Sequence, residues 1–272
     1  MANPRLTPRF YIDIVRDICY YRDMKSRNPK KALLTQAQAA ILNEVTLRYG
    51  DIITFDQIVA VFGDMYSRTY LKQMASRLAK TGWLVRLRKG EYFVTDLHNL
   101  GHTTLSVYFL ANHYVQNSFV SFAQALQYHG MYDQLLSTVV SLALSQHPPM
   151  RIAGITYRYV KTQPKYFYGY EEVRVDGRMV RIATPEKALV DMIQFHRTEG
   201  AVALVTEKLS EHQSDLDIAR LTTYLSRANR VTRKIFASLL GQVGLEQAAL
   251  LLRKMNIRHH SLSNLERAKA SR

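Results

Sequence analysis

Residues 51–94 constrain the fold more than any other stretch, because helical and extended patterns follow one another there in a fixed order. Thr54 is placed to cap a helix that runs to Gly63, since its side-chain oxygen can accept a hydrogen bond from a first-turn amide. Gly63 and Asp64 then supply turn chemistry. Apolar residues recur inside this helix at helical spacing, which predicts one buried face: Phe55, Ile58, Val59 and Phe62.

A second helix is predicted from near Ser67 to Lys80. Gly82 ends it, because glycine adopts the left-handed conformation without a Cβ penalty. Its apolar stripe is expected to consist of Leu71, Met74, Ala75 and Leu78. The opposite face carries hydrogen-bonding and cationic side chains: Arg68, Thr69, Lys72, Gln73, Ser76 and Lys80.

Two short extended runs come next, Trp83–Leu87 and Glu91–Thr95, and a basic turn with a glycine separates them. This pattern predicts a hairpin with a cationic tip. Helix, turn, helix and hairpin in this order predict a winged helix-turn-helix, whose second helix enters the major groove while its hairpin contacts phosphates or the minor groove. A winged helix used only for protein contacts is the alternative. The predicted DNA-binding residues are Ser67, Arg68, Thr69, Lys72, Gln73, Ser76, Lys80, Arg86, Arg88 and Lys89.

The charge of the chain favours a polyanionic partner. Its 272 residues include 37 Lys and Arg against 22 Asp and Glu, a formal net charge of +15. Residues 1–100 carry +7 and the remainder carries +8, so the excess is spread along the chain. Nucleic acid is the default partner of such a protein. An acidic protein is the alternative partner for the C-terminal half.

Other broad classes are disfavoured by the sequence. No apolar run reaches membrane-spanning length, and no helix combines a basic face with an aromatic apolar face. The first residues lack an apolar signal core, and the single Cys19 has no partner for an internal disulfide. We therefore expect a cytoplasmic protein that binds no membrane.

The predicted fold class is α+β, with an N-terminal winged helix-turn-helix followed by a mixed α/β domain that ends in a helical bundle. A basic helical leader is expected over 1–32, with a helix at Phe10–Met24 and a basic link at Lys25–Lys31. That link fits a DNA-contacting arm and a solvated linker equally well. The winged helix spans 33–96 and starts with a helix that Thr35 caps and Gly50 ends. Its core residues are predicted to be Ala39, Ile41, Leu42, Val45 and Leu47.

The C-terminal domain spans 97–272 and begins with a polar junction, Asp96–Thr104. A helix over Thr104–His113 precedes one that Ser121 caps and Gly130 ends. Strands are expected over about 139–182, with Asp176-Gly177 as a two-residue hairpin turn. Helices are expected over about 184–255: one that begins at Thr184-Pro185-Glu186, then Gly200–Glu211, Asp215–Ser226, Arg230–Val243 and Leu245–Met255, before a polar tail from Asn256.

Catalytic and metal chemistry finds little support. Paired cysteines and a His-Glu-x-x-His pattern are lacking, and His98 and His102 lie in the junction. Asp176 and Glu186 lack the spacing that a magnesium-dependent nuclease needs, and the pair Glu171-Glu172 fits a solvated strand edge. We therefore predict no catalytic residues, no metal and no cofactor. Four aromatic residues fit either base stacking or packing in a two-sided sheet: Tyr166, Phe167, Tyr168 and Tyr170.

Three segments carry a resemblance to a known family. The first is the winged helix ending in Gly90-Glu91-Tyr92; the second is residues 121–130, SFAQALQYHG; the third is residues 182–191, IATPEKALVD. The order of elements and these motifs, over about 35–195, resemble the AbiEi-type antitoxins of type IV toxin–antitoxin and phage abortive-infection systems. The basic leader before Leu33 departs from the shorter N-terminus of that family.

The resemblance implies a transcriptional autorepressor that is also an antitoxin. Its winged helix would bind inverted repeats in its own promoter, as two monomers or a weak dimer. Its C-terminal domain would neutralise an AbiEii-type nucleotidyltransferase-like toxin, without a stable complex in the best-known systems. Motif residues with expected roles as caps or turn residues are Ser121, His129, Thr184, Glu186 and Asp191. The alternatives are a DNA-binding regulator of a mobile element or defence locus without a toxin, and an enzyme that processes nucleic acid.

Overall fold

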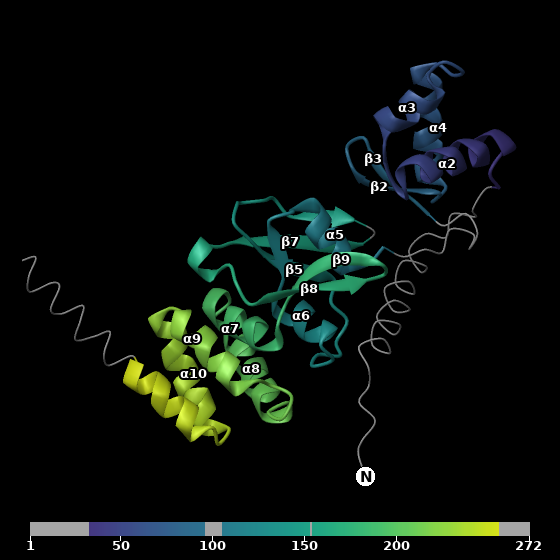
Figure 1. Ribbon diagram of the computed structural model, residues 1–272. Coiled ribbons are helices and arrows are strands. Elements are labelled where there is room, and N and C mark those ends of the chain that lie inside the picture. The colour runs from purple at the N-terminus through teal and green to yellow at the C-terminus, as the bar shows by residue number, and fades with distance from the viewer. Residues whose placement is uncertain (1–32, 96–104, 153, 256–272) are drawn as a thin grey trace, which may run out of the picture. The chain divides into compact units, whose positions relative to one another are not determined.

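The computed structural model describes residues 33–95, 105–152 and 154–255 (Figure 1). Two compact units contain them, one within 33–95 and the other within 106–255. Each unit has its own sheet and its own helices, and the fold class is α+β, as predicted. Several sequence predictions lie outside the described residues: the helix Phe10–Met24, the basic link Lys25–Lys31, the junction Asp96–Thr104 with His98 and His102, the tail from Asn256, and Cys19.

The first unit joins three helices to a three-stranded antiparallel sheet of order β1-β3-β2. Thr35 and Thr54 each begin a helix with a capping box, in which the threonine accepts from a glutamine amide and that glutamine's side chain accepts from the threonine amide. The elements are α2 (Gln36–Tyr49), β1 (Ile52–Thr54), α3 (Phe55–Phe62), α4 (Arg68–Lys80), β2 (Leu84–Arg88) and β3 (Glu91–Val94).

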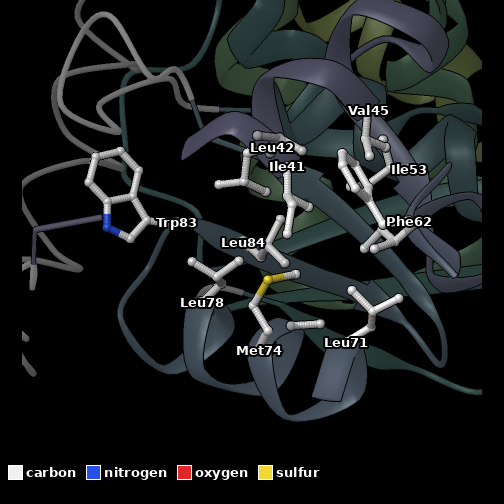
Figure 2. Close-up of a cluster of buried hydrophobic side chains, with 13 residues drawn as sticks. Ile41, Leu42, Val45, Ile53, Phe62, Leu71, Met74, Leu78, Trp83 and Leu84 are labelled. Carbon is white, nitrogen blue, oxygen red and sulfur yellow. The ribbon is translucent and has the colours of Figure 1, made fainter. Parts of the chain in front are cut away.

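One apolar core holds this unit together. All three helices and all three strands contribute buried side chains to it, and Figure 2 shows most of the labelled ones pointing toward one another. The prediction for α2 was wrong at Leu47, which is 75% exposed. The buried face of α2 consists of Ile41, Leu42 and Val45, and a residue two positions after Val45 lies about 200° around the helix, toward solvent.

The second unit is built on a six-stranded sheet of order β6-β7-β5-β4-β9-β8. The β5–β7 and β4–β9 pairs are parallel, whereas β4–β5 and β8–β9 are antiparallel. Its elements up to the sheet's last strand are α5 (Val107–Tyr114), β4 (Ser118–Val120), α6 (Phe122–Tyr128), β5 (Thr138–Ala143), β6 (Met150–Ile152), β7 (Ile155–Lys161), the 3-10 helix η1 (Pro164–Tyr166), β8 (Tyr170–Val175) and β9 (Arg178–Ala183).

Helices cover both faces of this sheet. Tyr159 of β7 donates its hydroxyl to the Ala111 carbonyl of α5 at 2.9 Å. Tyr159 of β7 lies opposite Ser141 of β5, and Ser141 lies opposite Val120 of β4. Residues directly opposite one another in a sheet point to the same face, so the Val120 side chain lies on the α5 face together with Tyr159. Phe119, the neighbour of Val120, must point the other way. It lies beneath the Lys187 ammonium of α7 (Pro185–Phe195), which is on the opposite face.

Four more helices follow, of which α8, α9 and α10 contact α7 (Figure 1). They are α8 (Glu199–Glu211), α9 (Ile218–Arg227), α10 (Arg230–Gln242) and a helix over 246–255. All of them, and α7, were predicted to within a few residues. Two features of the strand region were not predicted. Strand β4 has three residues that the sequence did not reveal, and residues 164–169 form the 3-10 helix η1 and an irregular stretch where extended structure was expected.

Candidate functional site

Helix α4 is held by local signals at both ends. Ser67 accepts a hydrogen bond from the Tyr70 amide at 3.3 Å, which caps the helix. At the C-terminal end, Gly82 has a φ of 81°, and the Trp83 amide donates a hydrogen bond to the Leu78 carbonyl at 3.0 Å. The four residues predicted for the apolar stripe are all buried: Leu71, Met74, Ala75 and Leu78. The opposite face of α4 is therefore fixed toward solvent.

All ten predicted DNA-binding residues are exposed. They come from the cap and outer face of α4, from β2 and from the turn that follows it: Ser67, Arg68, Thr69, Lys72, Gln73, Ser76, Lys80, Arg86, Arg88 and Lys89. We call this set, together with Arg77, the α4–β2 face. Arg77 is also exposed on α4 and was missed, although its charge and its place in the helix were visible in the sequence.

Three of the ten are engaged within the unit. Ser67 is the cap of α4. The Arg68 guanidinium contacts the Asp56 carboxylate at 2.8 Å and lies 5.1 Å from the centre of the Phe55 ring, so it ties α4 to α3. Arg88 pairs with the buried Glu91 at 2.8 Å across the hairpin. These side chains have structural partners already, which makes them weaker candidates for contact with a ligand.

The positive charge of the first unit is concentrated on the α4–β2 face. Residues 33–95 contain 8 Lys and Arg, of which 7 lie between positions 68 and 89, and no Asp or Glu falls in that interval. Five of these cations have no ion pair among the described residues: Lys72, Arg77, Lys80, Arg86 and Lys89. A surface of uncompensated cations around neutral hydrogen-bonding groups is suited to a polyanion.

In the second unit, the motif residues Thr184 and Ser121 make hydrogen bonds within the fold. Thr184 caps α7 by accepting from the Lys187 amide at 3.4 Å, as predicted. Ser121 was predicted to cap α6, but its side chain makes no cap hydrogen bond. The backbone explains the difference: Phe122 has a φ of 58°, and Ser121 Oγ donates to Asp191 Oδ2 at 2.7 Å instead.

A buried ion pair lies within the motif segment 182–191, and the Ser121 hydrogen bond links it to the segment 121–130. Lys187 Nζ and Asp191 Oδ1 are 2.5 Å apart on successive turns of α7, and both side chains are fully buried. The Lys187 ammonium also lies 4.5 Å from the centre of the Tyr168 ring. Burial raises the pKa of Asp191 to about 6, and the Lys187 and Ser121 contacts limit the rise. Lys187 was not singled out from the sequence. The signal for this ion pair was its position four residues before Asp191, because residues at that spacing are neighbours on one face of a helix.

His129 and Glu186 also fix the fold of this unit. His129 Nε2 donates to the Ala183 carbonyl of β9 at 2.8 Å. Burial lowers its pKa, against the opposing effects of that hydrogen bond, Glu171 and Glu186. Glu186 is 2% exposed and accepts from the Asp217 amide at 2.9 Å, which anchors the start of α9. Both residues therefore contact backbone groups of other elements within the unit.

The residues of the aromatic cluster are half-buried and pack against other side chains of the unit. Phe167 and Tyr170 lie against Phe119, with ring centres 5.0 and 4.9 Å away. Tyr168 lies under the Arg227 guanidinium at 3.7 Å as well as beneath Lys187. These contacts favour the packing interpretation over base stacking, although the packing occurs at a turn and a strand start and not across a two-sided sheet.

A groove on the second unit lies beside α5 and β9. Its polar groups are paired: Asn112 exchanges hydrogen bonds with the Arg181 backbone, and the Arg181 side chain binds Glu172 and the Gln116 carbonyl. Among the described residues, no group of three or more His, Cys, Asp or Glu is arranged to hold a metal ion. In the same ranges, no helix is long and apolar enough to cross a membrane.

Comparisons with known proteins define the fold alone. No protein-family model matches the chain, and no curated protein matches it. The structure is similar to the crystal structure of the RV2827C protein from Mycobacterium tuberculosis. The two chains share a TM-score of 0.59 and 15% sequence identity, with 83% of each chain covered.

Proposed function

We propose that the protein is a DNA-binding transcriptional regulator whose first unit is a winged helix-turn-helix. Its element order, with α3, a turn and α4 followed by the β2–β3 hairpin, is that of the motif. The observation that carries the proposal is the α4–β2 face, where 7 of the 8 cations of residues 33–95 gather. On this interpretation α4 enters the major groove, and Arg86 and Lys89 contact phosphates or the minor groove.

The test is binding of the full-length chain to duplex DNA from upstream of its own gene, measured in a gel-shift assay. Lys72→Gln with Lys80→Gln should weaken binding by about tenfold or more, because each lost phosphate contact removes a counterion-release contribution. The matched control is Lys161→Gln with Lys234→Gln, two exposed lysines of the second unit. Equal binding by the parent and the α4 variant would contradict the proposal.

We further propose that the regulator is an autorepressor and antitoxin that counters a nucleotidyltransferase-like toxin of the AbiEii type. The support is the resemblance of residues 121–130 and 182–191 to AbiEi motifs. The Ser121–Asp191 hydrogen bond gives one physical reason for two such motifs to occur together. A regulator of a mobile element without a toxin partner is the alternative proposal.

Co-expression with the product of the adjacent gene separates the two. If that product is a toxin, the full-length chain should restore growth, and so should the Lys72→Gln, Lys80→Gln variant. If the parent chain and the variant both restore growth, the surface that neutralises the toxin does not depend on these two lysines of α4. An adjacent product that is harmless, or toxicity that the parent chain leaves unchanged, would contradict the antitoxin proposal and leave the DNA-binding proposal standing.

A further inference from the structure

The exposed side of α4 has an ordered division between neutral and charged side chains. Thr69, Gln73, Ser76 and Lys80 occupy positions i, i+4, i+7 and i+11, which form a single stripe along a helix. We call them the outer stripe. It lies opposite the buried residues Leu71, Met74, Ala75 and Leu78. The first three members of the outer stripe are uncharged and able to hydrogen-bond.

The cations of α4 flank this stripe. At 100° per residue, Lys72 lies about 70° to one side of its centre and Arg77 about 70° to the other. Side chains at the edges of a helix seated in the major groove face the phosphate backbones, whereas the central stripe faces the base edges. If α4 binds DNA in this way, the neutral residues of the outer stripe are the ones placed to read its sequence.

Gln73 differs from its neighbours in hydrogen-bonding capacity. Its planar amide donates and accepts at once, which matches the N6 donor and N7 acceptor of adenine. The Thr69 and Ser76 hydroxyls bind any base edge, and the Lys80 ammonium only donates. Gln73 is exposed and has no hydrogen-bond partner within the described part of the chain, so its amide is available.

We propose that Gln73 is the specificity-determining residue of α4 and reads an adenine in the major groove. This inference rests on the proposed DNA-binding function. The experiment begins by selecting preferred duplexes from a random-sequence library with the full-length parent chain, Gln73→Ala and Gln73→Glu. A matched control is Gln213→Ala, a glutamine exposed on the second unit between α8 and α9. Thermal unfolding of each variant confirms that it is folded.

The parent should select a conserved adenine at one position of each half-site, and Gln73→Ala should lose that preference by about tenfold or more. Gln73→Glu should shift the preference toward cytosine, whose N4 group donates to a carboxylate. Replacing the adenine with 7-deaza-adenine removes the N7 acceptor, so it should weaken binding by the parent and by Gln213→Ala but not by Gln73→Ala.

The outcomes distinguish failure of this inference from failure of the proposed DNA-binding function. If the parent selects no duplex at all, DNA binding itself is wrong. If the parent selects a sequence and Gln73→Ala selects the same one with the same discrimination, Gln73 does not read the base and the inference is overturned, while DNA binding stands. A selected site in which the 7-deaza substitution affects parent and Gln73→Ala equally would also overturn it.

Discussion

The two units of the molecule use positive charge in different ways. In the second unit, Lys and Arg are interspersed with Asp and Glu, and some of the cations are paired within the fold: Arg181 with Glu172 at 2.9 Å, Arg220 near Glu171, Glu186 and Asp217, and Lys208 with Glu207 and Glu211. Lys187 is even buried completely against Asp191. In the first unit, 7 of the 8 cations gather in positions 68–89, where no Asp or Glu occurs, and five of them have no ion pair among the described residues.

This contrast shows why net charge alone says little about a site. Residues 1–100 and 101–272 carry similar excesses, +7 and +8. Removing one member of a buried ion pair destabilises a unit, whereas unpaired cations gathered on one face create a potential that attracts an external anion. Substitutions at the buried Lys187–Asp191 pair should therefore change stability, and substitutions on α4 should change binding.

The largest effect is expected at the buried ion pair. Lys187→Met leaves Asp191 buried without a counter-charge, which should lower the free energy of unfolding by about 3–5 kcal/mol. Urea unfolding measures the loss. Combining Lys187→Met with Asp191→Leu should restore much of the stability, because both charges are then removed. A single variant as stable as the parent would show that the pair has no such role.

Gly169 should be the next most sensitive position. Its φ is +75°, and an added Cβ would lie 3.0 Å from both Lys187 Cγ and Tyr224 Cζ. Gly169→Ala should therefore cost about 3 kcal/mol or more, from backbone strain and overpacking together. Gly177→Ala is the matched control, since its φ is +77° but no atom lies within 4 Å. The control should lose only about 1 kcal/mol; equal losses would refute the crowding at Gly169.

His129 should make the stability depend on pH. Burial lowers its pKa in the folded state, so the unfolded chain takes up the proton first as the pH falls. The free energy of unfolding should then drop below about pH 6.5, by at most about 1.4 kcal/mol per pH unit from this residue. His129→Gln keeps a donor for the Ala183 carbonyl and should flatten that slope. Parallel curves for parent and variant between pH 7 and pH 5 would count against this assignment.

The smallest effect is expected at Arg68, although the sequence predicted that this residue contacts DNA. Both members of the Arg68–Asp56 pair are largely exposed, so Arg68→Ala should change stability by less than about 1 kcal/mol. Because the guanidinium is held by α3, the variant should also lose less DNA affinity than Lys72→Ala. Fluorescence anisotropy with one duplex compares the two, and a larger loss for Arg68→Ala would show that it leaves Asp56 to contact DNA.

Local signals made much of the fold predictable. Thr35, Thr54 and Thr184 cap helices because side-chain hydroxyl groups suit the first turn, and Asp176-Gly177 forms the hairpin because both residues adopt positive φ. Helical spacing identified the buried stripe of α4, and hence its exposed face.

Features that depend on distant contacts were not predictable. Ser121 has the sequence of a cap, yet its hydroxyl binds Asp191, 70 residues away. Strand β4 has three residues and exists because β5 and β9 pair with it on either side. Likewise, the engagement of Arg68 by Asp56 depends on how α3 and α4 pack. Sequence periodicity gives the exposed face of a helix but not which of its side chains already have partners.

The salt dependence of DNA binding tests the central claim most directly. The logarithm of the association constant should fall linearly with the logarithm of salt concentration for the full-length chain. In the Lys72→Gln, Arg77→Gln, Lys80→Gln variant the slope should shrink by about 2.7, since each phosphate contact contributes about 0.9. The Lys161→Gln, Lys234→Gln control should keep the slope of the parent. A triple variant that keeps the full slope, or a parent that binds no duplex, would contradict the assignment of the α4–β2 face to DNA.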